Sequence, residues 1–230
     1  MSKENVTKTT PSVIRGAIFD MDGTLIDSMW IWERYASRYI RSRGLSPAAD
    51  LDDAVATFTL AESAAYLAAT YRLDGGAERV ARELAEGAVA LYDRVTPKAG
   101  VLAMLEAFRR AGVRMALATM TERPTAERVL SRLGILPYLS HIFTCDEVGA
   151  LKSSPKIYRE ALRALGTKRE ETPVFEDAPF ALATAARDGF PTVFVLDGHG
   201  ARDPLASARA FLTVGDLADA PWERYLPKSP

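Results

Sequence analysis

The chain has 230 residues, of which 48% are hydrophobic and 26% are charged, proportions typical of a soluble globular protein with a sizeable core. Its 29 basic and 30 acidic residues give a net charge of −1, which leaves no positive field to hold a nucleic acid or an anionic membrane. The single cysteine, Cys145, excludes an internal disulfide and a zinc site of several cysteines, so we expect a reducing, cytoplasmic location.

The first element expected in chain order is a buried strand. Residues 1–12 are polar and lack the apolar stretch of a signal peptide or membrane anchor, so we expect a disordered tail. The run VIRGAIFD follows and ends at Asp20, and two further carboxylates, Asp22 and Asp27, come soon after it. Like charges this close repel one another unless a cation or a proton lies between them. The segment therefore indicates a chemical site.

Residues 29–95 show helical periodicity and no convincing strand. The helical segments are WIWERYASRYIRSRG, LAESAAYLAATYRL and GAERVARELAEGAVALYDRV. Crossovers between parallel strands are normally much shorter than this interval. We therefore predict an all-helical cap domain over 29–95, inserted after the first strand, with the sheet resuming at TPKAGV.

Strand-like and helical segments alternate over the rest of the chain. The strand-like runs are VRMALATM, HIFTCDE, TPVFED and PTVFVLD, and the helical ones are AGVLAMLEAFRRAG, TAERVLSRLG, PKIYREALRALG and PFALATAARDG. Each helical segment ends at a glycine (Gly112, Gly134, Gly166 and Gly189), as is common where a helix terminates. The pattern predicts an α/β fold, with 13–28 and 96–230 forming a doubly wound, Rossmann-like parallel sheet.

Polar side chains follow the predicted strands where an open parallel sheet binds its ligands. They are Asp20 and Asp22 after the first strand, Thr119 after the second, Lys152 soon after the third, and Glu176 and Asp177 after the fourth. Carboxylates can hold a cation, the cation and an ammonium can neutralise phosphate oxygens, and a free carboxylate can attack phosphorus. The set predicts magnesium-dependent phosphoryl transfer.

These residues lie in motifs that resemble those of the haloacid dehalogenase superfamily. The motifs are DMDGTLIDS, Thr119, KSSPKIY and FEDAPFALATAARDG, and the helical insertion is similar to the cap of the subgroup that contains beta-phosphoglucomutase and many small-molecule phosphatases. The chain departs from the usual motifs at Ser153, where a proline is frequent, and at Ala181, where a glycine is frequent. Neither departure removes a catalytic group.

The resemblance implies a role for each matching residue. Asp20 would be the nucleophile that forms an aspartyl-phosphate, and Asp22 would be the general acid and base. Thr119 and Lys152 would bind the phosphate. Mg²⁺ would be held by Asp20, by Asp177 and by the main-chain carbonyl of Asp22, and Glu176 would support these ligands.

The resemblance also narrows the reaction. Dehalogenases and phosphonatases of the superfamily lack a carboxylate at the position of Asp22, so its presence here is similar to the phosphate-ester enzymes. We expect hydrolysis of a small phosphorylated metabolite, with a sugar-phosphate mutase as the alternative and a non-catalytic binding protein as a minor one. Against the mutase, VATFTLAESAAYL contains no basic residue to grip a second phosphate, although Arg72 or Arg79 could reach in from elsewhere on the cap. The substrate and the oligomeric state are not predicted.

Each assignment has a structural alternative. The Asp20–Asp22 segment could begin a calcium loop, although a strand-like run precedes it. Thr119 could be an ordinary strand-end hydroxyl and Lys152 a solvated lysine. One of Glu176 and Asp177 could cap the next helix, and we prefer a helix cap for Asp27.

The cap holds tentative specificity residues. Met29, Trp32, Phe58 and Leu60 are candidates to contact substrate, although aromatic residues at helical spacing, including Trp30, Tyr35 and Tyr39, usually belong to a core. His141 and Cys145 are interpreted as structural, and no role as a base is expected for His199.

Overall fold

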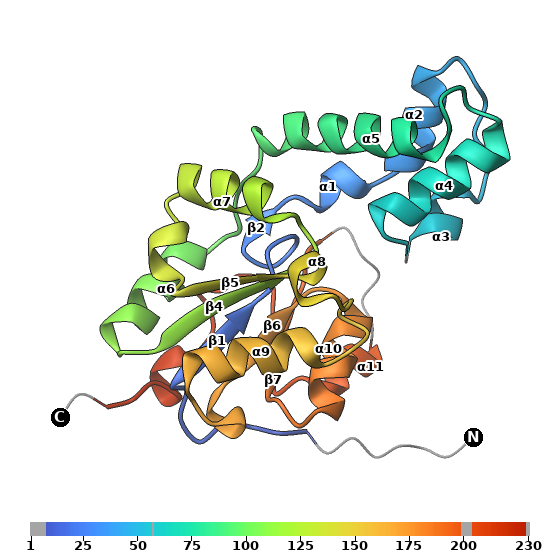
Figure 1. Cartoon of the computed structure of the whole chain (residues 1–230). Helices are drawn as coiled ribbons and strands as arrows, with labels where there is room; N and C mark the ends of the chain where they lie inside the picture. The colour runs from blue at the N-terminus through green and yellow to red at the C-terminus, as the bar shows by residue number, and fades with distance from the viewer. Residues whose placement is uncertain (1–7, 57, 199–203, 229–230) are drawn as a thin grey trace, which may run out of the picture. The chain divides into compact units, whose positions relative to one another are not determined.

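The structure is a computed structural model, and it describes residues 8–56, 58–198 and 204–228. The chain forms two compact units, whose elements are labelled in Figure 1. The sheet unit contains the residues up to Asp27 and those from Thr96 onward, and the helical unit contains residues Ser28–Val95. Ser28, grouped above with the first strand, belongs to the helical unit. Of the tail expected at 1–12, residues 1–7 lie outside the described residues, whereas Pro11 is buried.

Six parallel strands form the sheet unit, in the order β5-β4-β1-β6-β7-β8. They are β1 (Gly16–Phe19), β4 (Arg114–Thr119), β5 (His141–Thr144), β6 (Val174–Glu176), β7 (Thr192–Val195) and β8 (Leu212–Val214). From β1 the chain order runs outward in both directions, first to β4 and β5 and then to β6, β7 and β8. The carboxyl end of β1 is therefore the switch point at which open α/β sheets bind ligands.

Helices connect these strands, and one 3-10 turn follows the last of them. They are α6 (Val101–Arg110), α7 (Arg123–Arg132), α8 (Cys145–Val148), α9 (Lys156–Leu165), α10 (Pro179–Arg187) and α11 (Pro204–Arg209), with 3-10 turns η1 (Leu136–Tyr138), η2 (Arg169–Glu171) and η3 (Trp222–Arg224). The four predicted helical segments correspond to α6, α7, α9 and α10. The four glycines that end them have backbone φ angles between 59° and 86°, the left-handed conformation that glycine adopts at little cost.

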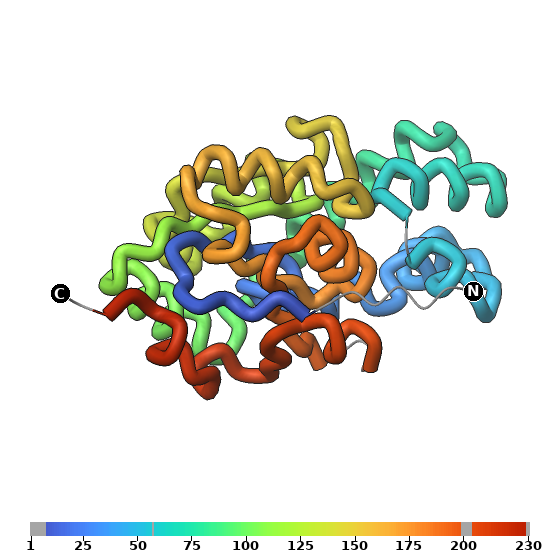
Figure 2. The backbone as a smooth tube through the Cα atoms, turned by 90° about the horizontal axis from the view of Figure 1, so that it is seen from below, coloured from blue at the N-terminus to red at the C-terminus, as the bar shows by residue number. Residues whose placement is uncertain are grey.

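The core alternates across the central strand, as the two-residue period of a strand requires. Ile18 packs in one cluster with Ile157 and Tyr158 of α9. The next residue, Phe19, points to the opposite face, where its ring centroid lies 4.4 Å from that of Phe175 and 6.3 Å from that of Phe108 in α6. Figure 2 shows α9 on one side of the blue β1 and the red carboxy-terminal segment on the other. The predicted doubly wound architecture is confirmed.

The helical unit consists of α1 (Met29–Trp32), α2 (Tyr35–Ser42), α3 (Leu51–Val55), α4 (Leu60–Tyr71) and α5 (Gly76–Tyr92). Its core joins α2, α3, α4 and α5 through Ile40, Leu51, Leu67 and Leu84. Two features differ from the sequence analysis. The helix expected over residues 30–44 is broken between α1 and α2, where Arg34 adopts a left-handed φ of 54°, and the short α3 was not predicted.

The sheet does not resume at TPKAGV, so that expectation is wrong. Thr96–Pro97 forms β3, which pairs antiparallel with β2 (Ile26–Asp27), and the next strand of the main sheet is β4. Pro97 has no N–H to donate, which suits a short ladder but not an interior strand. The three-residue β8 was also not predicted. No helix in the described part of the chain is long and apolar enough to cross a membrane.

Candidate active site

The site begins at the turn that follows β1. The N–H of Asp20 donates to the carbonyl of Phe175 at 3.0 Å, which ties the end of β1 to β6. Three residues later the chain reverses at Gly23, whose φ of 75° is unfavourable for residues with a side chain. The carbonyl of Met21 accepts from the N–H groups of Leu25 and Ile26 at 2.9 and 3.0 Å. This closed turn fixes Asp20 and Asp22 at the switch point of the sheet.

Lys152 lies at the centre of the site, with a side chain only 3% exposed. Its ammonium contacts the Asp20 carboxylate and donates to Oε1 of Glu176 at 2.7 Å. Burial alone would lower the pKa of Lys152, but the Asp20 and Glu176 carboxylates outweigh it and raise the pKa above its ordinary value. Lys152 is therefore a buried, charged lysine and not a solvated one.

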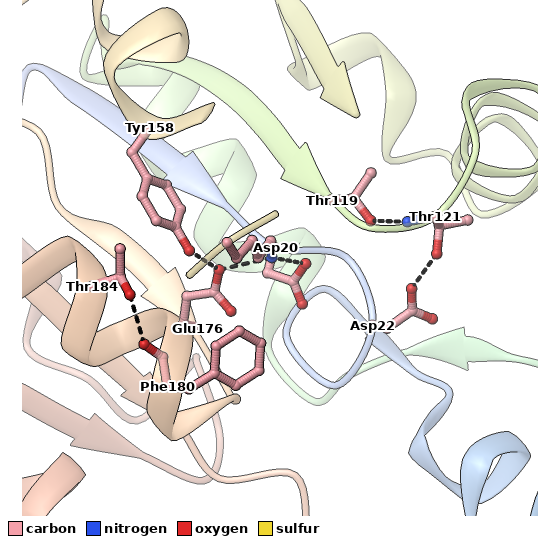
Figure 3. Close-up of polar contacts among 9 residues, drawn as sticks. Asp20, Asp22, Thr119, Thr121, Tyr158, Glu176, Phe180 and Thr184 are labelled. Atoms are coloured by element: carbon pink, nitrogen blue, oxygen red, sulfur yellow. Dashed lines mark hydrogen bonds and ion pairs between the residues drawn. The ribbon is translucent and has the colours of Figure 1, made fainter. Parts of the chain in front are cut away.

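Glu176, the last residue of β6, is fully buried. Oε1 accepts from the Lys152 ammonium and, at 2.7 Å, from the hydroxyl of Tyr158 (Figure 3). Oε2 is also buried and has no hydrogen-bond donor among the described residues. Burial raises the pKa of this carboxyl, against the lowering effect of Lys152. A buried carboxylate oxygen without a donor is costly, which points to a cation or water at this position.

Asp20, Glu176 and Asp177 each offer a carboxylate oxygen to one small volume, in which these three atoms lie within 4.8 Å of one another. Burial raises the pKa of Asp177 to about 7, with a further contribution from the charge of Glu176. Burial also raises the pKa of Asp20 well above its ordinary range, although Lys152 opposes it. One ammonium is insufficient for three crowded carboxylates. An all-oxygen donor set with excess negative charge fits a hard cation such as Mg²⁺.

Asp22 lies apart from this carboxylate group. Its Oδ2 accepts from the hydroxyl of Thr121 at 2.6 Å, and the N–H of Thr121 donates to Oγ1 of Thr119 at 3.0 Å (Figure 3). Thr119 is the last residue of β4 and is fully buried. The two hydroxyl residues therefore link the end of β4 to the turn after β1. Asp22 remains half-exposed, so its carboxylate is partly accessible to solvent.

Two residues of the site, Thr121 and Tyr158, are not among the predicted ones. Thr121 lies two residues after Thr119, and Tyr158 lies in the quoted segment KSSPKIY. Spacing from a strand end could have suggested Thr121, because a hydroxyl two residues beyond Thr119 is still at the sheet edge. No sequence pattern indicates that the Tyr158 hydroxyl, on the buried face of α9, reaches Glu176.

Two of the helix-cap alternatives are wrong. The residue at the N-cap of α10 is Ala178, so neither Glu176 nor Asp177 occupies it. The residue before α1 is Ser28, and Asp27, for which we preferred a helix cap, instead belongs to β2. A strand, and not the helix of a calcium-binding hand, precedes Asp20.

The four tentative specificity residues all belong to the helical unit. The Trp32 ring packs edge-to-face against Tyr35 and Tyr92, with ring centroids 5.5 and 6.4 Å apart. The Phe58 side chain is 39% exposed and its ring lies 6.0 Å from that of Tyr66. Met29 and Leu60 are half-buried at the first positions of α1 and α4. Substrate contact by these residues stays a prediction.

Cys145, His141 and His199 have no predicted role in the chemistry. Cys145 is buried at the start of α8, and burial raises its thiol pKa to about 11. His141 is exposed on β5 and stacks on Phe143. His199 lies outside the described residues.

Comparison with known proteins adds an independent observation. Residues 14–188 match the family described as haloacid dehalogenase-like hydrolase. A validoxylamine A 7'-phosphate phosphatase from Streptomyces hygroscopicus subsp. limoneus is 30% identical, over 90% of this chain and 95% of the relative. A phosphoglycolate phosphatase from Rhodospirillum rubrum is 28% identical, over 89% and 88%. The structure of a putative beta-phosphoglucomutase from Thermotoga maritima matches 90% of this chain and 96% of that chain, with a TM-score of 0.73 and 25% identity.

Proposed function

The chain belongs to the haloacid dehalogenase-like hydrolase family and is a phosphatase of it, and we propose that it hydrolyses a small-molecule phosphate monoester with Mg²⁺ through an aspartyl-phosphate. The single observation that carries the proposal is the buried contact of Asp20 with Lys152, beside the carboxylates of Glu176 and Asp177. This arrangement provides a nucleophile, a phosphate-binding cation and a metal site within one small volume.

The residues that would hold Mg²⁺ are Asp20, Asp177 and the main-chain carbonyl of Asp22, with Glu176 in support. When bound, Mg²⁺ supplies positive charge that attracts the phosphate oxygens and stabilises the charge that develops on them. Burial raises the pKa values of the Asp20 and Asp177 carboxyls, because their charged forms lack solvation. A cation at this position would stabilise these charged forms, which supports the proposed metal site.

In the first half of the reaction, an Asp20 carboxylate oxygen forms a bond to phosphorus as the ester P–O bond breaks. Asp22 gives its proton to the departing oxygen, which leaves as an alcohol. Lys152 and the Thr119 hydroxyl donate hydrogen bonds to the phosphoryl oxygens. Thr119 Oγ1 accepts a hydrogen bond from the N–H of Thr121, and the hydroxyl proton of Thr119 would then be directed to the phosphate.

In the second half, water attacks phosphorus and the bond to the Asp20 oxygen breaks. Asp22, now a carboxylate, accepts the proton of the attacking water, and inorganic phosphate is released. The Thr121 hydroxyl donates to Oδ2 of Asp22 and helps to hold this carboxylate in place for the exchange. Asp22 thus gives a proton in one step and takes one in the next, so the enzyme returns to its starting state.

The substrate is a small phosphorylated metabolite, in keeping with the compounds that the names of the two phosphatase relatives state. Its non-phosphate part would be selected by the helical unit, where Met29, Trp32, Phe58 and Leu60 are the candidate contacts. A balanced net charge disfavours nucleic acid as a partner, and a single buried cysteine suits the cytoplasm.

A sugar-phosphate mutase is the second candidate, which the 25% identity to a putative beta-phosphoglucomutase favours. A mutase must grip a second phosphate with a cationic group. The start of α4 offers none. Instead, Thr59 caps this helix and exchanges hydrogen bonds with Glu62, an acidic residue. Hydrolysis is therefore the preferred reaction.

The test is a screen of phosphorylated metabolites with Mg²⁺ or with EDTA, in which phosphate release is measured. We expect release from at least one small monoester only with Mg²⁺, and trapping of a beryllium fluoride phosphate mimic against Asp20. Release that is equally fast in EDTA would overturn the metal dependence. Glucose 1-phosphate with catalytic glucose 1,6-bisphosphate separates the two candidates, because efficient isomerisation with little phosphate release would establish the mutase.

A further inference from the structure

We infer that Tyr158 is a positioning residue for the magnesium site, and that its hydroxyl orients the Glu176 carboxylate so that Oε2 is directed to the cation. This inference rests on the proposed function. It assigns to Tyr158 a purpose in metal binding that its packing alone does not require.

The first observation is the geometry of the two donors on Glu176. The Tyr158 hydroxyl and the Lys152 ammonium both donate to Oε1, each at 2.7 Å. Neither donates to Oε2, which is buried and has no donor among the described residues. A carboxylate can rotate about its last side-chain bond, and two donors on the same oxygen select one orientation of it. The oxygen without a donor is then held in a defined place.

The second observation is that Lys152 alone cannot fix this orientation. Its ammonium is shared between Asp20 and Glu176, so its position depends on both carboxylates. Tyr158 differs from Lys152, because the one hydrogen bond described for its hydroxyl is the bond to Glu176. The Tyr158 side chain is fully buried in the core cluster of α9, and its ring lies 6.3 Å from that of Phe190. A rigidly packed ring provides a donor at a fixed point.

The third observation is the choice of residue. Phenylalanine would fill the same space in an apolar cluster without a polar atom to satisfy, and would avoid burying a hydroxyl. The Tyr158 hydroxyl donates to Glu176. Glu176 belongs, with Asp20 and Asp177, to the only group of three acidic side chains in the described part of the chain that could hold a metal. Partners that hold metal-site carboxylates by hydrogen bonds commonly change metal affinity by about 10–100-fold when removed.

The experiment measures Mg²⁺ binding to metal-free protein by calorimetry, with thermal unfolding in EDTA in parallel. The variants are Tyr158→Phe, Glu176→Gln and the double variant. Tyr39→Phe is the matched control, because the Tyr39 hydroxyl also donates to a glutamate, Glu83 at 2.6 Å, in the helical unit. We expect Tyr158→Phe to weaken Mg²⁺ binding by about tenfold or more, and Tyr39→Phe to leave it unchanged.

The double variant tests whether Tyr158 acts through Glu176. Tyr158→Phe should cause no further loss of Mg²⁺ affinity in the Glu176→Gln background, because this variant has no second carboxylate oxygen for the tyrosine to direct to the cation. A loss of less than about threefold in Tyr158→Phe, whatever its unfolding temperature, would overturn the inference, as would full additivity in the double variant. If Tyr158→Phe does not fold, the Glu176→Gln variant tests the inference instead, because unchanged Mg²⁺ binding in Glu176→Gln would also overturn the inference.

These outcomes are separate from failure of the proposed function. A wild-type protein that binds no Mg²⁺ and releases no phosphate would overturn the proposed function and, with it, this inference. A wild-type protein with magnesium-dependent activity, accompanied by a Tyr158→Phe variant with unaltered metal affinity, would overturn this inference alone.

Discussion

Glu176 in the sheet unit and Glu83 in the helical unit have similar partners and opposite electrostatics. Each accepts a hydrogen bond from a tyrosine hydroxyl and contacts a cation, Lys152 for Glu176 and both Arg43 and Arg79 for Glu83. Hydrogen bonds from Tyr39 and Arg79 lower the pKa of the Glu83 carboxyl, whereas burial raises that of Glu176. The Glu83 side chain is 21% exposed and that of Glu176 is 1% exposed.

Burial, and not the number of partners, decides whether each of these two carboxylates is stable in its charged form. Two arginines offset the negative charge of Glu83, and its side chain is partly exposed to water, as is usual for a structural ion pair. The network around Glu176 holds more negative charge than its single lysine offsets. Such an imbalance is typical of a site that receives another cation.

The largest expected difference between the two networks is in catalysis. Asp20→Asn keeps the shape of the side chain but removes the attacking carboxylate, so turnover should fall by more than about 10⁴-fold. Glu83→Gln, in the network of the helical unit, should leave turnover within about twofold of wild type. Magnesium-dependent phosphate release measures both. Near-normal activity of folded Asp20→Asn would remove Asp20 from its role as nucleophile.

The next largest effect is on stability. Lys152→Met leaves Asp20 and Glu176 buried without their ammonium, and should lower the free energy of unfolding by about 3–5 kcal/mol in EDTA at pH 7. Arg79→Met removes one of two arginines from an accessible glutamate and should cost much less. Urea unfolding of the two variants gives the comparison. Equal losses would contradict the distinction that we draw between the networks.

The third effect is on metal dependence. Asp177→Asn removes a charged oxygen from the proposed magnesium site and should raise the Mg²⁺ concentration needed for half-maximal activity by about tenfold or more. The control is Asp74→Asn, a change at an exposed acidic residue of the helical unit, which should leave that concentration unchanged. An Asp177→Asn variant with the magnesium dependence of wild type would show that Asp177 is not a ligand.

The smallest effect is on the pH dependence of stability without metal. Burial raises the pKa of Asp177 from its ordinary value of 3.8 to about 7. Between these two pH values the carboxyl is protonated in the folded protein and ionised in the unfolded chain. The stability linked to Asp177 is full below pH 3.8 and is lost as the pH rises through about 7. Glu83 has the opposite sign, because its lowered pKa gives stability above the ordinary value of 4.5, which is lost as the pH falls.

Thermal unfolding in EDTA at pH 5 and pH 7.5 tests these signs. Asp177→Asn should reduce the loss of stability between the two pH values, because the titrating group is gone. Glu83→Gln should keep the loss seen in wild type, since Glu83 titrates below this range. An Asp177→Asn variant with the wild-type pH dependence would contradict the assignment.

Much of the fold follows from local sequence. The five predicted strands are short apolar runs, and the four helices predicted after residue 98, which are α6, α7, α9 and α10, have helical periodicity and each end at a glycine. The missed elements are short. The two-residue β2 and β3 and the three-residue β8 have too few residues to show a period, and they exist because a partner strand lies beside them. The break at Arg34 likewise has no glycine or proline to predict it.

The site was predictable where position along a strand determines it. Asp20, Thr119 and Glu176 lie at or just after strand ends, and parallel strands bring such residues to one edge. Tyr158 was not predictable, because its partner lies 18 residues away and only packing of α9 against the sheet brings them together. Asp27 was misassigned since its β2 pairing depends on Thr96, far along the chain.

The ladder between β2 and β3 has a consequence for how the chain folds. Asp27 and Thr96 are paired neighbours, so the segment between them leaves and re-enters the sheet unit at adjacent points. Pairing of β1 with β4 must close a loop that spans this whole segment, and such closure is slow for an unstructured chain. Once the segment has formed its own helices and their shared core, the loop left to close is short. Early formation of the helical unit should thus speed assembly of the sheet. A different inserted domain, whose first and last residues lie equally close together, should leave the rate of sheet assembly unchanged.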